Sequence, residues 1–335
     1  MVKADAYGHG AVPVARAAQA GGASRLAVAT AGEAATLRAA GIGGPLIVLG
    51  ALTDEELALA LRADAEIVVW HESFLRRIGE RRARVHVKLD TGLMRLGTRD
   101  LEAATEVARH AAASPNLRLL GAMTHLATAD EPGSLFVAEQ LEQFAQWVAR
   151  LRGAHPRLVA HAANSAATIQ EPDSHFDMVR TGMAIYGLNP FDRDGLAGEL
   201  EPALSLSSYI ADVKVCARGE TAGYGRAFVA REATRIAVIP IGYADGYPRA
   251  LSGRGKVEIA GKCYPVVGWI SMDNLAVDLG PTGTPNHGEE VLLIGSNVSV
   301  DDIARWAGTI NYEVICRIGP RVMRTYHRDG VPSEW

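Results

Sequence analysis

Two hydrophobic periods alternate along the first 190 residues of the chain. Short apolar runs rich in β-branched residues predict buried strands of a parallel sheet. We expect such strands at Val2-Lys3, Leu26–Thr30, Leu46–Gly50, Glu66–Trp70, Val85–Asp90, Leu119–Leu126, Leu158–Asn164 and Met178–Gly187. Longer helical patterns lie between most of them. Alternation of strands and helices in this way predicts a parallel sheet with helices packed on it.

Local signals support the predicted helices. Thr30-x-x-Glu33 and Thr53-x-x-Glu56 have the form of capping boxes and directly follow predicted strands. The clearest amphipathic pattern is one apolar face formed by Val137, Leu141, Phe144, Val148 and Leu151. Eight strand–helix units favour a closed (β/α)8 barrel over an open doubly wound sheet, since no G-x-G-x-x-G motif follows an early strand.

The pattern changes near residue 190. Asn189–Pro202 is rich in Gly, Pro and Asp and predicts a linker. Beyond it we expect strands within Leu204–Cys216, Arg235–Ile241, Lys256–Asp278 and Val291–Ile294, then a helix at Val300–Ala307 and a strand pattern around Tyr312–Arg324. The predicted fold class is therefore α/β: a (β/α)8 barrel over residues 1–199, with a truncated first strand, followed by a predominantly β domain over residues 200–335.

Composition narrows the classes of protein that fit. The chain has 335 residues and is 48% hydrophobic, enough to bury a large aliphatic core. A net charge of −4 and the lack of a Lys/Arg run argue against nucleic acid as a partner, and no apolar stretch is long enough to span a membrane. The cysteines, Cys216, Cys263 and Cys316, are odd in number and lack zinc-ligand spacing. We expect a cytoplasmic protein without a metal site.

Polar side chains gather at the carboxyl ends of the predicted barrel strands, where barrel active sites are built. They are Lys3 at the first strand, Lys88, Asp90 and Arg95 at the fifth, His125 at the sixth, His161, Asn164 and Ser165 at the seventh, and Arg180 on the eighth. Taken alone, each has a structural explanation: Lys88 and Asp90 could form a buried ion pair, and Ser165 could cap a helix. Independent structural roles would scatter these residues over both barrel ends, so their shared edge favours a functional site.

The loops after the seventh and eighth strands indicate what this site binds. Barrels often bind phosphate there, and "ANSAAT" and "RTGMAIYG" offer a hydroxyl and a glycine-exposed backbone N–H. Lys3, across the barrel mouth, can form a Schiff base with an aldehyde once neighbouring charge or burial depresses its pKa. The combination predicts a phosphate-bearing aldehyde cofactor, pyridoxal 5′-phosphate.

Nine short motifs, in register from Val2 to about Arg324, resemble those of the alanine racemase family. They are "VKADAYGHG", "VKLDTGLMRLG", "THLATAD", "HAANSAAT", "MVRTGMAIYG", "AGYGRAF", "IGYADGYPR", "SMDN" and "INYEV". The resemblance implies a pyridoxal-phosphate enzyme with a barrel and a β domain. Such an enzyme interconverts L-alanine and D-alanine by a two-base mechanism and supplies D-alanine for peptidoglycan synthesis. It also implies a homodimer whose active sites are shared between subunits.

The resemblance also implies catalytic roles. Lys3 matches the lysine that holds the cofactor as a Schiff base and acts as one base, and Tyr224 matches the opposing base, supplied by the second subunit. Two bases are needed because inverting a stereocentre removes the α-proton from one face and returns it to the other. Arg180 matches the arginine that donates to the pyridine nitrogen, with His161 and His125 supporting Arg180 and Tyr224.

Further matches surround the cofactor and the substrate. The implied cofactor-binding residues are Lys3, Tyr7, His125, His161, Asn164, Ser165, Arg180, Gly182, Met183 and Tyr312. Among these, the phosphate cradle is Tyr7, Ser165, the Gly182-Met183 backbone and Tyr312. Arg95 and the Met272 N–H match the groups that bind the substrate carboxylate, and Tyr243 and Arg249 match residues of the access corridor. Lys88 matches a lysine that is often carbamylated, and the anionic carbamate would form an ion pair with Arg95.

Two features depart from the family pattern. Trp269, in "GWISMDN", stands where an arginine is more usual, which changes the expected shape and charge of the access corridor. Family members also carry a further segment before the lysine, including most of the first barrel strand. Because a strand typically needs about five residues to pair on both sides, we expect Met1-Val2 not to close the barrel seam.

Three alternatives stay open at this point. A racemase of broader specificity, acting for example on serine, would differ only in pocket geometry. A barrel that binds pyridoxal phosphate without catalysis would lack a β domain carrying the Tyr224 and Tyr312 motifs. A fold-related decarboxylase would need a carboxylate at the pyridine nitrogen, and Arg180 argues against it.

Overall fold

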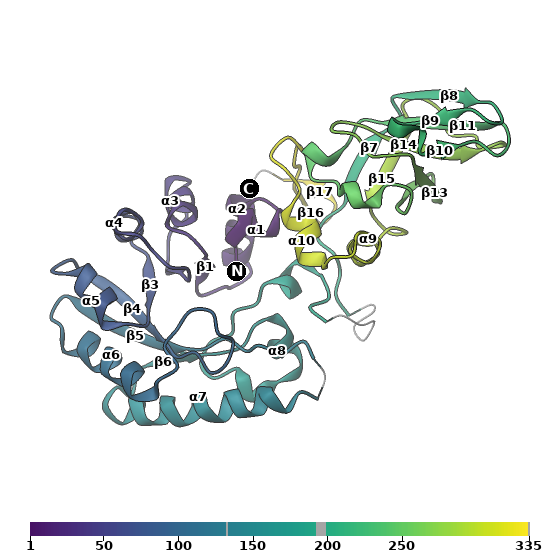
Figure 1. The fold of residues 1–335 in the computed structure, drawn as a ribbon. Helices are drawn as coiled ribbons and strands as arrows, with labels where there is room; N and C mark the ends of the chain where they lie inside the picture. Colours follow the sequence, from purple (N-terminus) through teal and green to yellow (C-terminus); the bar gives the residue numbers. More distant parts are fainter. Residues whose placement is uncertain (132, 192–198, 334–335) are drawn as a thin grey trace. The chain divides into compact units, whose positions relative to one another are not determined.

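The computed structural model of the chain describes residues 1–131, 133–191 and 199–333. These residues form two compact units, Met1–Leu200 together with Ser333, and Glu201–Pro332. Figure 1 shows both units, and each is described in turn. None of the helices in the described ranges is long and apolar enough to cross a membrane.

A parallel sheet in strict chain order forms the centre of the first unit. Its strands within the described residues are β1 (Leu26–Val28), β2 (Leu46–Val48), β3 (Glu66–Val69), β4 (Ala83–Lys88), β5 (Leu117–Met123) and β6 (Val159–His161). Leu26 pairs with Leu46, and Ile67 pairs with Val85. Neighbouring strands that are sequential and parallel, with a helix in most connections, are the arrangement expected of the predicted barrel.

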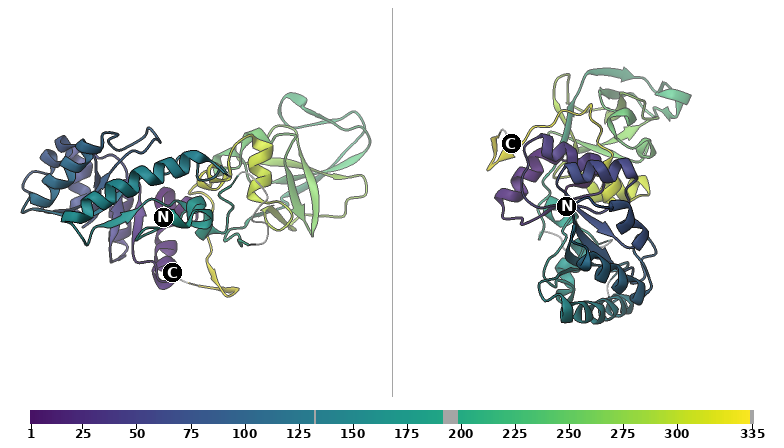
Figure 2. Two further views of the ribbon diagram at one scale, coloured as in Figure 1. Left: turned by 90° about the horizontal axis from the view of Figure 1, so that it is seen from below. Right: turned by 90° about the vertical axis from the view of Figure 1, so that its left-hand side faces the viewer.

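The helices of this unit surround the sheet, as Figures 1 and 2 show. Their bounds are α1 (Lys3–Tyr7), α2 (Ala11–Ala20), α3 (Ala31–Ala39), α4 (Asp54–Arg62), α5 (Glu72–Ile78), α6 (Leu101–Ala113), α7 (Leu135–Ala154) and α8 (Ser165–Gln170), with short 3₁₀ turns η1 (Pro172–Ser174) and η2 (Met183–Tyr186). Both predicted capping boxes are confirmed, at the starts of α3 and α4. The predicted apolar face of α7 is also confirmed: Leu141 is partly buried and the other four residues are buried.

The first and eighth predicted strands, Val2-Lys3 and Met178–Gly187, are wrong as regular strands. Lys3 begins α1, and the chain after Gly182 turns into η2, so neither segment is extended for long enough. Isolated backbone hydrogen bonds stand in their place. The Val2 N–H donates to the Ala27 carbonyl over 2.9 Å, and the Met1 ammonium donates to the Thr181 carbonyl over 3.0 Å. The ring therefore has a bond on each side of Met1-Val2, contrary to the expectation of an open seam.

The inner face of the sheet holds an apolar layer. Ala27, Ile47, Val68 and Met123 are buried there against one another, with partly buried Met1, Leu49, Trp70 and Met178 around them. Alternate residues of a strand share a face. On β3, Val68 and Glu66 point the same way, and on β4 so do His86 and Lys88. Polar side chains therefore point into the barrel interior on both sides of the apolar layer. Glu66 lies toward the amino ends of the strands and Lys88 toward their carboxyl ends.

The second unit is an antiparallel sheet with a helical pair. Its strands are β7 (Leu206–Tyr209), β8 (Asp212–Cys216), β9 (Thr221–Ala222), β10 (Phe228–Val229), β11 (Thr234–Ile239), β12 (Lys256–Ile259), β13 (Lys262–Val267), β14 (Leu275–Gly280), β15 (Glu290–Ile294), β16 (His327–Arg328) and β17 (Val331–Pro332). Seven of them form one sheet in the order β7-β15-β12-β13-β14-β11-β8. Between them lie the 3₁₀ turns η3 (Tyr224–Arg226), η4 (Tyr243–Asp245) and η5 (Arg249–Leu251).

The helix predicted at Val300–Ala307 is confirmed as α9, but the strand predicted around Tyr312–Arg324 is wrong. Asn311–Cys316 forms α10 instead, and no strand begins before His327 in the described part of this stretch. The buried residues of α10 are Asn311, Val314 and Ile315, a helical spacing in which the aromatic and β-branched side chains suggested a strand. Part of the predicted linker, residues 192–198, lies outside the described residues.

Candidate active site

Lys3 begins a left-handed turn. Ala4, Asp5, Ala6 and Tyr7 have φ values of 52°, 51°, 53° and 54°. Non-glycine residues in this region cost roughly 1–2 kcal/mol each, so the turn needs outside support. Glu33, beyond closing its capping box, accepts from the Ala4 N–H over 2.6 Å, and Asp5 accepts from the Ala11 N–H over 2.7 Å. Strain held in this way is typical of functional sites.

Tyr7, Ser165 and Gly182 meet at one point of the first unit. The Ser165 hydroxyl accepts from the Gly182 N–H over 2.7 Å and from the Ala184 N–H over 3.3 Å. A Cβ at position 182 would lie 2.5 Å from the Tyr7 hydroxyl, so only glycine allows this approach. Met183 follows, fully buried. The structure thus brings together four predicted phosphate-cradle residues from α1, α8 and η2.

Asn164, rather than Ser165, caps α8. Its side chain accepts from the Ala167 N–H over 3.0 Å, and its backbone is extended, as an N-cap requires. The structural explanation considered for Ser165 is therefore wrong. Ser165 instead spans to Gly182, which leaves its hydroxyl in the cradle.

Arg180 is a buried cation with several neutral acceptors. Its Nη1 contacts His161 Nδ1 over 2.9 Å, and its Nη2 lies 2.8 Å and 2.9 Å from the carbonyls of Thr124 and Ala162 and 3.1 Å from His125 Nδ1. Burial, and then Arg95, lower the pKa of Arg180 to about 10, so it stays protonated at neutral pH. Among the described residues, none accepts a hydrogen bond from its Nε.

Both histidines beside Arg180 are neutral. Burial is the main cause that places the pKa of His161 and of His125 well below the usual value, and the charge of Arg180 adds to it. Neutral rings can accept from the donor-only guanidinium, whereas imidazolium rings could not. Both rings therefore contact Arg180 as acceptors, and their expected role beside Tyr224 stays a prediction.

Lys88 does not form the ion pair considered for it with Asp90. Its side chain is buried, and within the described residues no carboxylate lies at ion-pairing distance from it. Asp90 Oδ1 instead accepts from the N–H groups of Gly92 and Met94 over 3.0 and 3.2 Å, shaping the loop that carries the exposed Arg95. Burial, with the charges of Arg95 and Arg180, lowers the pKa of Lys88 to about 8.

In the second unit, Tyr224 stands on a glycine turn. Gly223 and Gly225, on either side, have φ values of 76° and 64°, and the Tyr224 side chain is 74% exposed. A Cβ at position 225 would lie 3.3 Å from Trp269 Nε1. Trp269 in turn stacks on Arg249, whose Cζ is 4.8 Å from the indole ring centroid. Trp269 therefore packs between the turn of Tyr224 and a predicted corridor residue.

The loop after Trp269 contains Met272 and is hydrogen-bonded to the 3₁₀ turn that carries Tyr243. The Tyr243 N–H donates to the Ser271 carbonyl over 3.1 Å, and the Ala244 N–H donates to the Met272 carbonyl over 3.0 Å. Both side chains are exposed. Tyr312 lies on α10 and is partly buried. The second unit thus joins Tyr224, Tyr243, Arg249 and Met272 through one loop.

Two buried polar residues of the first unit that connect to the site were not predicted from the sequence. Glu66 and His86 lie in strands β3 and β4 and connect to His161 by hydrogen bonds. A signal for His86 was present, because it shares the inward face of its strand with Lys88. Glu66 gives a similar signal, as a lone carboxylate in the apolar run "AEIVVW".

Comparison with known proteins places this geometry in a family. The family model "Alanine racemase, N-terminal domain" matches residues 1–190, and "Alanine racemase, C-terminal domain" matches residues 203–326. Alanine racemase of Desulforamulus reducens is 40% identical over 97% of this chain and 90% of its own length, and alanine racemase 2 of Bacillus subtilis is 40% identical over 98% and 88%.

Solved structures agree with these matches. Alanine racemase from Streptomyces lavendulae superposes with a TM-score of 0.91 at 39% identity, covering 98% of this chain and 89% of its own. The Bacillus anthracis alanine racemase with bound L-Ala-P gives 0.92 at 36% identity, covering 99% and 89%. The predicted fold class, an α/β barrel followed by a β domain, is confirmed. The matches to both domains and the shared fold show that this chain belongs to the alanine racemase family of isomerases.

Proposed function

We propose that this protein interconverts L-alanine and D-alanine with pyridoxal 5′-phosphate held by its first unit. Membership in the alanine racemase family supports the reaction, and it implies the supply of D-alanine for peptidoglycan. One observation supports both the proposed cofactor and the proposed location of its site. Lys3, the Tyr7–Ser165–Gly182 cluster and Arg180 belong to the same unit, and Lys3 and Arg180 both lie close enough to His125 to lower its pKa.

The donor groups of this unit suit the cofactor. A phosphate needs several hydrogen-bond donors in a concave site. The hydroxyls of Tyr7 and Ser165 can each donate, and the Gly182-Met183 backbone adjoins them, with the Gly182 N–H directed at Ser165 Oγ. A pyridine nitrogen without a proton needs a donor, and the Nε–H of Arg180 has no acceptor among the described residues. Lys3 is the amine that would hold the aldehyde.

When bound, pyridoxal phosphate withdraws electrons from the α-carbon of an attached amino acid. The residues of this chain then decide how the proton moves. Lys3 Nζ takes or returns the α-proton on one face, and Tyr224 does so on the other. Arg180 keeps its proton at neutral pH and only donates a hydrogen bond, so it would leave the pyridine nitrogen unprotonated and limit that electron withdrawal.

The substrate carboxylate calls for positive charge and N–H donors. Arg95, exposed on the loop shaped by Asp90, supplies the charge, and the Met272 N–H supplies a donor. Lys88 adds CO2 through its neutral amine, forming a C–N bond and releasing one proton. The resulting carbamate is an anion that can pair with Arg95. Tyr243 and Arg249, with Trp269 stacked on the latter, line the access corridor.

Tyr224 acts in a homodimer, in which the partner subunit's Tyr224 faces Lys3 of the first. The surface around Tyr224 supports this. A groove of about 930 Å³ in the second unit is lined partly by Val215, Tyr224 and Trp269, with Val215 77% exposed. Exposed apolar and aromatic side chains beside a groove are typical of protein interfaces.

Lys3→Ala should remove both cofactor attachment and racemisation. The purified wild-type protein with added pyridoxal phosphate is expected to be yellow, and borohydride should fix the cofactor on Lys3. The variant should lose this labelling and slow roughly 100- to 10,000-fold. Lys256→Ala is a matched control on an exposed strand residue and should change neither property. A Lys3→Ala variant that still racemises with cofactor would overturn the assignment.

Tyr224→Phe should separate the two proton transfers. Because the enantiomers have equal free energy, kcat/KM is the same in both directions and cannot reveal the asymmetry. Exchange of the α-hydrogen with D2O can reveal it. The variant should exchange one enantiomer through Lys3 while racemisation falls roughly 100-fold or more. Tyr209→Phe, on exposed strand β7, should leave both rates unchanged. Equal loss of exchange for both enantiomers would contradict a one-face role.

Mixing the two inactive variants tests whether the site is shared. A heterodimer of Lys3→Ala and Tyr224→Phe subunits has one site with both bases intact. After random exchange of subunits, about one quarter of the wild-type sites should be restored. If both bases came from the same subunit, mixing would restore no activity.

Carbamylation of Lys88 should depend on pH and on Arg95. The neutral amine reacts with CO2, so the carbamate should appear as pH rises through about 8, the lowered pKa of Lys88. The measurement is ¹³C NMR with ¹³C-bicarbonate. Lys88→Arg should lose the signal. Arg95→Met should move its onset to higher pH, because a nearby positive charge is removed. An onset that does not respond to Arg95 would contradict this account.

A further inference from the structure

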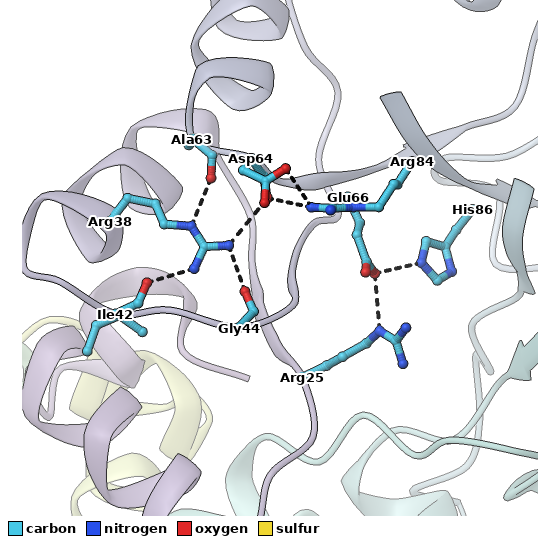
Figure 3. A network of polar contacts seen from close by, with 9 residues as sticks. All are labelled: Arg25, Arg38, Ile42, Gly44, Ala63, Asp64, Glu66, Arg84 and His86. Carbon is cyan, nitrogen blue, oxygen red and sulfur yellow. Dashed lines mark hydrogen bonds and ion pairs between the residues drawn. The ribbon is translucent and has the colours of Figure 1, made fainter. Parts of the chain in front are cut away.

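A line of hydrogen bonds crosses the barrel interior to Arg180. Arg25 Nε and His86 Nε2 both contact Glu66 Oε2, over 3.2 and 3.0 Å, as Figure 3 shows. His86 Nδ1 then lies 3.0 Å from His161 Nε2, and His161 Nδ1 lies 2.9 Å from Arg180 Nη1. Glu66 is the first residue of β3, whereas Arg180 belongs to the site at the carboxyl ends of the strands. The line therefore connects the two ends of the barrel.

Burial and packing fix these side chains. Glu66 is 3% exposed, and both His86 and His161 are fully buried. Gly121 pairs with His86 on the neighbouring strand, and a Cβ there would lie 2.4 Å from His86 Nδ1. The rings meet edge to face, with centroids 5.0 Å apart and an interplanar angle of 83°. A buried ring held this closely has little freedom to change its partners.

The two ends of the line determine where its protons lie. Arg180 can only donate, so its contact with His161 Nδ1 is a hydrogen bond only when the proton of this neutral ring lies on Nε2. His161 Nε2 therefore donates to His86 Nδ1, and the proton of His86 lies on Nε2. The acceptor for that proton is the Glu66 carboxylate.

A protonated His86 would break this order. Its Nδ1–H would donate to His161 Nε2, which would push the His161 proton to Nδ1, opposite the N–H of Arg180. Burial lowers the pKa of His86, in agreement with a neutral ring. Burial alone raises the pKa of Glu66, but the hydrogen bond from His86 and the charge of Arg25 lower it below the usual value. The pair is therefore an ionised carboxylate and a neutral imidazole.

We propose that Glu66 and His86 are positioning residues that fix His161 as the hydrogen-bond acceptor of Arg180 and so set the orientation of its guanidinium in the active site. The link to catalysis rests on the proposed function, since it assigns Arg180 to the cofactor. The order of protons does not depend on that assignment. It follows from a hydrogen-bond acceptor at one end and a guanidinium that can only donate at the other.

Selective ¹⁵N-histidine NMR of the holoenzyme tests the order of protons directly, because protonated and unprotonated ring nitrogens resonate apart. Wild-type His86 and His161 should both carry their proton on Nε2. Glu66→Gln keeps an oxygen that can accept from His86, so it should keep both signals and stay within about twofold of wild-type kcat. Glu66→Leu removes the acceptor, so it should mix the tautomers and lower kcat on the order of tenfold at an unchanged KM.

A second pair of variants distinguishes loss of the hydrogen-bond order from loss of folding. His86→Gln can accept from His161 and donate to Glu66, so it should preserve the His161 tautomer, whereas His86→Leu should not. Asp64→Asn is the control for the loss of a negative charge. Asp64 lies two residues before Glu66, and its exposed carboxylate pairs with Arg84. This variant should leave signals and rates unchanged.

Unaltered His161 signals in Glu66→Leu and His86→Leu would overturn the proposal, and so would equal losses of kcat in the leucine and glutamine variants. Failure of the proposed function would look different. In that case the wild-type protein would show the predicted tautomers but no racemisation of alanine.

Discussion

The guanidinium of Arg180 is buried and protonated at neutral pH, and the interior of the first unit supplies its hydrogen-bond acceptors. A charge taken out of water costs several kcal/mol unless hydrogen bonds replace its hydration. Here the acceptors are two backbone carbonyls, of Thr124 and Ala162, and the neutral rings of His125 and His161. They come from the ends of two neighbouring strands, so Arg180 is satisfied only when the barrel has formed. In the proposed function, binding of the cofactor at the Nε–H of Arg180 would therefore be coupled to correct assembly of the sheet.

A second constraint acts on the backbone around Lys3. The left-handed turn from Ala4 to Tyr7 would not persist on its own, and Glu33 connects it to the start of α3. Gly182 then allows the Tyr7 hydroxyl to approach closely from the other side. The lysine, the tyrosine and the cradle are thus held by contacts between segments far apart in the sequence. This gives a pre-organised site, which lowers the entropy that ligand binding must overcome.

The sequence allowed much of this to be predicted where the signal is local. Capping boxes involve residues three apart, and the face of α7 repeats at helical spacing, so Thr30, Thr53 and Phe144 could be placed from the sequence. Tyr312 was misplaced because its neighbours favour strands by composition, whereas packing of Val314 and Ile315 selects a helix. The hydrogen bonds that hold Met1-Val2, and the roles of Glu66 and His86, depend on strands being brought together by closure of the barrel. No local pattern contains that information.

The placement of the carboxylates leaves the positive charges of the candidate site without ion-pair partners among the described residues. The charges of Arg95 and Arg180 lower the pKa of Lys88, and the charge of Arg95 lowers that of Arg180. Yet none of the three cations has an ion-pairing carboxylate in the part of the chain that the structure describes. Asp90, the nearest acidic neighbour in sequence, is engaged by backbone N–H groups of its own loop. A carboxylate in direct contact with Arg180 would orient the guanidinium, but it would also neutralise the positive charge of that group. In the proposed arrangement, Glu66 acts through two uncharged imidazole rings instead. It would then fix the geometry of Arg180 while the positive charge at the barrel mouth stays available to the anions that the proposed site binds.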